Sequence, residues 1–286
     1  MSSILIKVTG FIGDTLFSTS VARQLKKDGF TGIIDYKIPV YPPYEILQLN
    51  NSINRIFLPN EEIDESVYDK VFTLPPCNQE EPPTIQYQKY CGVKNLDPSY
   101  EIKVPKDSVD VVSNMMKPYK QQGRKIVAWQ GNWEEKSFGY TEEEYKRGVD
   151  VPNLGYGGRR RDINFLVSEL SKRYLLIKVG FDPGVTQNQI GLLTTGIYTH
   201  TAAILSQCDY MIGGESGLIN LAAGVGTKTI ITGDYVHQLY GWNGVIRKLK
   251  EPKLGPEFYF ESGHVSLNPY LTDKEVVEQI INIIGN

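Results

Sequence analysis

The sequence predicts two α/β domains of the doubly wound kind, each built on a mostly parallel sheet. Three observations point to this fold class. The chain has 286 residues, which is more than one hydrophobic core usually organises. Short β-branched apolar runs alternate with helical patterns in both halves, as in parallel sheets. Each half also holds a glycine-containing turn between a strand and a helix, which is where such folds bind ligands.

The first half opens with a buried strand, a glycine turn and a helix. Residues 4–8 are short and rich in β-branched side chains, and Thr9-Gly10 follows them at once. Apolar residues then recur near helical spacing from Leu16 to Leu25, and Lys26-Lys27-Asp28-Gly29 provides a stop. Further predicted elements of this half are strands at 33–36, 55–58 and 70–74 and helices at 44–49, 84–91 and 109–116.

The second half restarts the alternation after a polar stretch at 118–124, so we place the domain boundary there. Residues 1–118 form the predicted N-terminal domain and residues 119–286 the C-terminal domain. A closing amphipathic helix is expected at 272–284, and it is an element that could pack back on the N-terminal domain. Other predicted elements of this half are strands at 125–129, 175–179, 210–212 and 229–231 and helices at 163–173, 199–206 and 217–225.

Composition and charge narrow the function classes. Hydrophobic residues make up 41% and charged residues 22% of the chain, as in an ordinary globular protein. A formal net charge of −3 provides no global positive field for a polyanion. The three cysteines are far apart, which favours a reducing compartment. Because no signal peptide or membrane-spanning run is seen, we expect a cytoplasmic protein whose membrane contact, if any, is peripheral.

The first segment that carries chemistry runs from Lys7 to Thr15. Gly10 and Gly13 leave bare backbone at a helix N-terminus, so a ligand can approach it closely. Asp14 falls in the first turn of that helix, where an acidic side chain is stabilising through the helix dipole alone. In the functional interpretation, its carboxylate accepts a proton from an attacking hydroxyl and is a general base.

The second segment runs from Cys208 to Thr227. A strand leads into Gly213-Gly214-Glu215-Ser216-Gly217 and then directly into a helix. Backbone N–H groups at that helix start can bind a diphosphate, and Glu215 can accept hydrogen bonds from ribose hydroxyls. A tight turn with Ser216 as the helix cap explains the same residues without a ligand.

These two segments resemble the heptosyltransferase family, glycosyltransferase family 9. Residues 12–16, Ile-Gly-Asp-Thr-Leu, are similar to the family's first turn and helix. Residues 215–223, Glu-Ser-Gly-Leu-Ile-Asn-Leu-Ala-Ala, resemble its second motif, Asp-Ser/Thr-Gly-x-x-His-Leu-Ala-Ala. The resemblance implies a GT-B fold, in which two Rossmann-like doubly wound domains face a central cleft. The N-terminal domain would be the acceptor side, and the C-terminal domain would bind the nucleotide sugar.

The resemblance also implies a reaction and its partners. A nucleotide-diphosphate sugar would be the donor, and a single displacement with Asp14 as general base would invert the anomeric centre. The acceptor would be a glycan or glycolipid, ahead of nucleic acid. No cofactor beyond the nucleotide-sugar co-substrate and no metal are expected, and no Asp-x-Asp sequence occurs. The implied donor-binding residues are Gly13, Gln130, Gly131, Lys136, Gly214, Glu215, Ser216, Gly217 and Asn220.

The chain departs from the family's pattern in three places. Glu215 and Asn220 replace the usual Asp and His, and the stretch at 74–87 is shorter than in typical members, so the acceptor stays open. Arg159 and Arg160, in a run of three arginines, are a candidate phosphate clamp. A run of like charge is also typical of a solvated face.

Two other functions fit part of the sequence. A NAD(P)-dependent short-chain reductase would use residues 8–13 as its glycine turn and Asp35 as its ribose-binding acid. However, the full G-x-x-G-x-x-G is absent, and no Tyr-x-x-x-Lys pair lies on a convincing helix. A nucleotide-sugar epimerase or a binding protein could have the same GT-B fold and a different function. A modified base in phage-type DNA is an alternative acceptor, against which the negative net charge argues mildly.

Overall fold

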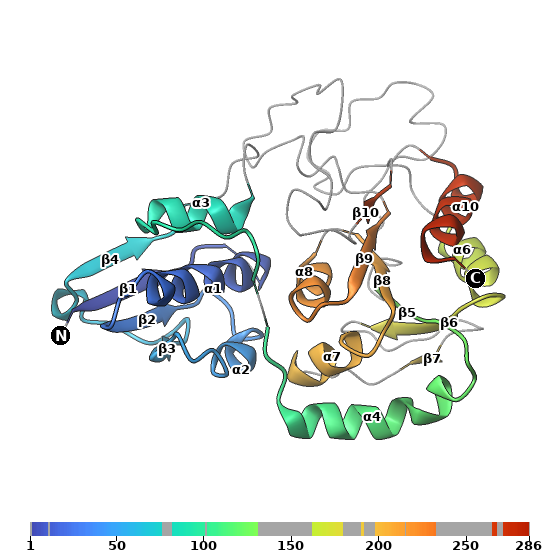
Figure 1. Ribbon diagram of the computed structural model, residues 1–286, viewed down its shortest axis with the longest axis horizontal. Helices are drawn as coiled ribbons and strands as arrows, with labels where there is room; N and C mark the ends of the chain where they lie inside the picture. The colour runs from blue at the N-terminus through green and yellow to red at the C-terminus, as the bar shows by residue number, and fades with distance from the viewer. Residues whose placement is uncertain are drawn as a thin grey trace.

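The computed structural model describes residues 2–10, 12–75, 82–100, 102–130, 162–179, 190–191, 198–214, 216–232, 265–267 and 271–285. Within these ranges the chain builds two sheets, and every strand pair in them is parallel (Figure 1). This arrangement confirms the predicted fold class of two parallel α/β units.

The first sheet has four strands in the order β3-β2-β1-β4. Leu5 at its centre lies opposite Asp35 in β2 and Val71 in β4. Because β2 and β3 lie on one side of β1 and β4 on the other, the strand order reverses between β1 and β4. In parallel sheets such a reversal is where ligands bind, beyond the carboxyl ends of the strands. The strands are β1 (Ser3–Lys7), β2 (Ile33–Lys37), β3 (Arg55–Phe57) and β4 (Lys70–Thr73).

Helix α1 is the central helix of the first lobe. It connects β1 to β2 and packs against α3, and most of its side chains are buried. The hydroxyl of Tyr36 in β2 donates to the carbonyl of Ser18, 2.7 Å away, which attaches α1 to the sheet. The helices of this lobe are α1 (Ile12–Lys27), α2 (Tyr44–Leu47), the 3-10 helix η1 (Glu65–Val67) and α3 (Pro83–Tyr90).

The second sheet has six strands in the order β10-β9-β8-β5-β6-β7, so its order reverses between β5 and β8. The sequence did not predict β7 or β10, since two residues are too few to show a hydrophobic period. The strands are β5 (Ile126–Gln130), β6 (Leu175–Val179), β7 (Ile190–Gly191), β8 (Tyr210–Gly213), β9 (Lys228–Ile231) and β10 (Val265–Ser266).

Helices pack on both faces of the second sheet. In β5 the alternating side chains divide between two apolar clusters, with Ala128 on the side of α7 and α8 and Trp129 on the side of α6 and α10. Figure 1 shows α7 and α8 on the side of this sheet nearer the first lobe, with α6 and α10 away from it. The helices are α4 (Lys106–Lys120), α6 (Ile163–Ser171), α7 (Tyr198–Leu205), α8 (Gly217–Gly224) and α10 (Asp273–Ile284).

Helix α10 is the closing amphipathic helix that the sequence predicts. A capping box between Thr272 and Glu275 fixes its start. Its apolar side packs against α6 and joins Val127 and Trp129 in one cluster of the second lobe; a contact of this helix with the N-terminal domain stays a prediction. The predicted boundary at 118/119 falls inside α4, which packs against α7; this division stays a prediction.

None of the described helices combines the length and apolar character that a membrane span requires.

The two lobes share a hydrophobic cluster. It runs from Ile6 and Leu16 in the first lobe to Ile219 and Leu221 in α8. Contacts of α1 with α8 and of α2 with α7 cross between the lobes. The lobes are therefore joined by packed helices as well as by the connecting chain.

The chain between the lobes is bonded to both. The hydroxyl of Tyr100 donates to the carbonyl of Asn220 in α8, and its ring meets the Phe17 ring edge-on with centroids 5.4 Å apart. Two residues later, the N–H of Ile102 donates to the carbonyl of Gly224 at 2.9 Å. The described residues of this connecting segment, 94–100 and 102, therefore lie against α1 and α8 together.

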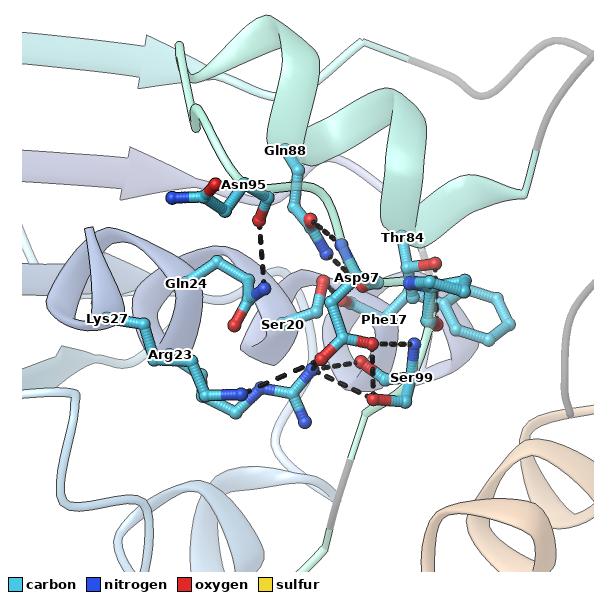
Figure 2. A network of polar contacts seen from close by, with 11 residues as sticks. Phe17, Ser20, Arg23, Gln24, Lys27, Thr84, Gln88, Asn95, Asp97 and Ser99 are labelled. Atoms are coloured by element: carbon cyan, nitrogen blue, oxygen red, sulfur yellow. Dashed lines mark hydrogen bonds and ion pairs between the residues drawn. The ribbon is translucent and has the colours of Figure 1, made fainter.

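A polar network attaches the start of this segment to α1 (Figure 2). The Asp97 carboxylate accepts hydrogen bonds from the N–H and hydroxyl of Ser99 at 2.9 and 2.6 Å and from Arg23 at 3.0 Å. Lys27 lies 3.7 Å from the same carboxylate. Burial alone would raise the pKa of Asp97, but the Ser99 hydrogen bonds and the charges of Arg23 and Lys27 outweigh it and hold that pKa below its ordinary value.

We expect Asp97→Asn to destabilise the protein by about 1–2 kcal/mol at neutral pH. Because folding lowers the pKa of Asp97, the ionised carboxylate stabilises the fold above its unfolded pKa of about 3.9 and loses this effect as the pH falls through the folded value. Urea unfolding of both proteins should therefore show the difference at pH 7 and a smaller one below about pH 4. Asp110→Asn, at an exposed position of α4, is the control, and an Asp97 effect of equal size at both pH values would contradict this assignment.

Candidate active site at two helix starts

Each of the two predicted motifs lies beside the point where the strand order of its sheet reverses. β1 leads through Gly10 into α1, whose first turn carries Asp14. β8 ends at Gly213 and leads into α8, whose N-cap is Ser216. Each helix therefore starts beyond the carboxyl end of a strand beside the switch point, which is the ligand-binding position of this architecture.

The starts of α1 and α8 lie against each other. A Cβ built on Gly13 would lie 2.6 Å from Nδ2 of Asn220, and one built on Gly217 would lie 2.9 Å from Cγ2 of Ile12. Real Cβ atoms essentially never lie this close to another atom, so a side chain at either position would require the facing Asn220 or Ile12 side chain to move. The two segments that the sequence singled out, more than 200 residues apart, are thus brought together.

The Asp14 carboxylate is half-buried and has a buried neighbour that the sequence analysis did not select. The hydroxyl of Tyr87, in α3, donates to Oδ1 of Asp14 at 2.9 Å. The Tyr87 side chain is only 2% exposed. Oδ2 of Asp14 lies close over Gly10, where an added Cβ would be 2.1 Å from it. Tyr87 falls in the helix predicted at 84–91, and no sequence motif marks it.

At the start of α8, two predicted residues, Ser216 and Gln130, contact each other. Ser216 Oγ accepts the N–H of Ile219 at 3.5 Å and donates to Oε1 of Gln130 at 2.9 Å. Gln130, at the end of β5, also lies against Gly213, whose added Cβ would be 2.8 Å from Oε1. The first turn of α8, which lies within the described chain, carries no acidic side chain. Its N–H groups and positive dipole end are therefore suited to an anionic ligand.

Asn220 is part of the contact between the lobes. It is 7% exposed, its amide lies over Gly13, and its carbonyl accepts the Tyr100 hydroxyl. Its predicted donor-binding role stays a prediction. Among the other predicted residues, the structure gathers Gly13, Asp14, Gln130, Gly214, Ser216 and Gly217 at the two helix starts. Outside the described residues lie Gly131, Lys136, Arg159, Arg160 and Glu215.

Other reactive groups give no competing centre in the described part of the chain. No group of three or more His, Cys, Asp and Glu side chains there could hold a metal ion, and the expectation of metal independence stays a prediction. Burial raises the pKa of both Cys91 and Cys208 to about 12, so neither thiol is a ready nucleophile near neutral pH.

Comparison with known proteins gives matches in structure alone. No protein-family model and no curated protein sequence matches the chain. A family 9 glycosyl transferase from Veillonella parvula DSM 2008 is similar with a TM-score of 0.65 at 10% identity, over 99% of this chain and 97% of that one. The ADP-heptose LPS heptosyltransferase II of E. coli is similar with a TM-score of 0.56 at 13% identity, over 99% of this chain and 98% of that one. The E. coli heptosyltransferase WaaC with ADP-2-deoxy-2-fluoro heptose is similar with a TM-score of 0.55 at 9% identity, over 98% of this chain and 99% of that one.

The chain therefore has the GT-B fold of family 9 glycosyltransferase structures, as the sequence resemblance predicted. The match extends over nearly the full length of both chains, so it includes both sheets and the chain between them. At this level of identity the likeness establishes the fold, and the reaction has to be argued from the site.

We expect Gly13→Ala to destabilise the protein by about 1–3 kcal/mol, because the new methyl group meets the Asn220 amide at the contact of α1 and α8. Asn220→Ala removes that amide and should recover at least about 1 kcal/mol of the loss in the double variant. Urea unfolding of the two single variants and the double variant measures this coupling. Strictly additive effects would contradict the close approach of Gly13 and Asn220.

Proposed function

We propose that this protein is an inverting, metal-independent glycosyltransferase, heptosyltransferase-like, that uses a nucleotide-diphosphate sugar as donor. The observation that supports the proposal is the close approach of the α1 and α8 starts, since Asp14 lies in the first turn of α1 and the first turn of α8 is suited to an anion. A fold shared with family 9 glycosyltransferase structures supports the same reaction class.

The start of α8 is the proposed diphosphate site. Ser216 and Gly217 are partly exposed, whereas Gly214 is buried, so the N–H groups that can donate to phosphate oxygens are those of the first turn of α8. Gln130 lies beside them through its bond to Ser216. Donors of this kind stabilise the charge that develops on a leaving diphosphate, which is the work that a metal ion performs in other transferases.

The Asp14 carboxylate is the proposed general base. In the transfer step, an acceptor hydroxyl oxygen bonds to the anomeric carbon while the bond from that carbon to the diphosphate oxygen breaks. The bonding pair leaves with the diphosphate, and the hydroxyl proton passes to Asp14. Attack opposite the leaving group inverts the anomeric centre.

The proposed acceptor is a hydroxyl of a glycan or glycolipid, and the proposed compartment is the cytoplasm, where nucleotide sugars are substrates. Two of the similar structures are E. coli heptosyltransferases, one named as an ADP-heptose LPS enzyme and one holding an ADP-heptose analogue. ADP-linked sugars are therefore the first donors to test.

The reductase alternative loses support from the position of Asp35. This residue lies in the middle of β2, is buried, and accepts the Tyr68 hydroxyl at 2.7 Å. A ribose-binding acid needs to lie at the carboxyl end of its strand, open to the ligand. An epimerase or a binding protein on this fold would bind donor equally well, so turnover with an acceptor is the deciding measurement.

We expect a nucleotide-diphosphate sugar to raise the Tm of the protein, because a ligand that binds only the folded chain stabilises it by mass action. Thermal shift with ADP-, GDP- and UDP-sugars, with and without EDTA, identifies the nucleotide and tests metal independence. NAD and NADP are the matched controls. A shift with NAD and none with any nucleotide sugar would favour the reductase.

We expect Asp14→Asn to lower the rate of transfer by about 100- to 10,000-fold, the range found when a general base is lost. Donor affinity should stay nearly unchanged, since the amide keeps the shape of the side chain. Calorimetry with the donor and a product assay with the acceptor separate the two effects. An Asp14→Asn protein that transfers at the original rate would remove Asp14 from the mechanism.

A further inference from the structure

We propose that Tyr87 is the positioning residue for the Asp14 carboxylate, acting through the hydrogen bond from its hydroxyl to Oδ1. This inference rests on the proposed function, in which Asp14 is the general base. It adds a residue from a third segment of the chain, since Tyr87 belongs to α3 and to neither of the two motifs.

The geometry gives Tyr87 a defined contact with the base. Its hydroxyl lies 2.9 Å from Oδ1, a normal distance for a hydrogen bond to a carboxylate. Its ring is 2% exposed and belongs to the hydrophobic cluster that the lobes share. A buried ring has few alternative rotamers, so the hydroxyl that it carries is held at one place.

The backbone of α3 is fixed as well. The Thr84 hydroxyl donates to the carbonyl of Pro98 at 2.8 Å. The Gln88 side chain donates to the carbonyl of Asp97 at 2.6 Å and accepts the Asp97 N–H at 2.9 Å. Figure 2 shows these bonds beside the Asp97 network on α1. The residues before and after Tyr87 are therefore tied to the connecting segment, and this segment is tied to the helix that carries Asp14.

A carboxylate held in this way has two inequivalent oxygens. Oδ1 accepts the Tyr87 hydroxyl, whereas Oδ2 lies on the side of Gly10. The hydroxyl also keeps the carboxylate plane from turning, and such orientation decides how often the base and the acceptor hydroxyl are aligned for proton transfer. Tyr87 does not exchange a proton in this scheme.

Tyr87→Phe tests the inference, because it removes one oxygen and keeps the ring. We expect kcat to fall about 10-fold while KM for donor and acceptor and the Tm stay close to those of the unchanged protein. In an Asp14→Glu background, where the carboxylate is displaced from the hydroxyl, adding Tyr87→Phe should change kcat by less than about 2-fold. A residue that only stabilises the fold would show neither the kcat-specific loss nor this dependence on Asp14.

Tyr90→Phe is the matched control, since Tyr90 lies on the same helix and is 49% exposed; its kcat should not change. If Tyr87→Phe does not fold, Thr84→Val replaces it, because it loosens α3 from Pro98 and leaves Tyr87 in place, with an expected fall in kcat of about 3-fold. Suppose that Asp14→Asn lowers the rate of transfer as expected. An unchanged kcat in Tyr87→Phe, or in Thr84→Val where that variant is needed, would then overturn the inference and leave the proposed function in place. Absence of transfer by the unchanged protein would instead overturn the proposed function, and the inference with it.

Discussion

The close approach of α1 and α8 is the constraint on which the site depends. Both helices begin there, so two positive dipole ends lie near each other and favour negative charge between them. One such charge is built in, as Asp14 in the first turn of α1. The first turn of α8 has no acidic residue, and in the proposed function the diphosphate of the donor provides the negative charge there. The glycines at 13 and 217 permit the contact that creates this environment.

Because α1 carries Asp14, the proposed base, and also forms the contact between the lobes, the proposed site and the arrangement of the lobes cannot vary independently. The connecting segment strengthens this link, since Asp97 is bonded to α1 and Tyr100 to α8. Directional bonds of this kind fix orientation more than they add stability. A shift of one lobe against the other would move Asp14 relative to the α8 start, so the distance between the proposed base and the proposed diphosphate site depends on both lobes.

Much of the fold could be predicted because it follows from periodic local signals. The strand at 175–179 was predicted with the bounds of β6, and the closing helix begins at its capping box. The GT-B fold followed from the resemblance of the two motifs. The strands β7 and β10 were missed because neighbouring strands define them, through pairing of Ile177 with Ile190 and of Ile230 with Val265. The association of α10 with α6 could not be predicted either, since an amphipathic pattern identifies an apolar side and not its partner.

The sequence predicted the candidate site residues that lie in the two motifs. The contacts that these residues make with other segments depend on tertiary structure. Tyr87 has no motif, and only the packing of α3 on α1 brings it to Asp14. Asn220 is a second residue whose role depends on its packing. It stands where the family has His, and in this chain its amide defines the space left for Gly13. An imidazole is larger than this amide, so the residue at 220 affects how closely α1 and α8 approach. The departure from the family's pattern therefore bears on the spacing between the proposed base and the proposed donor site as well as on any direct contact with a donor.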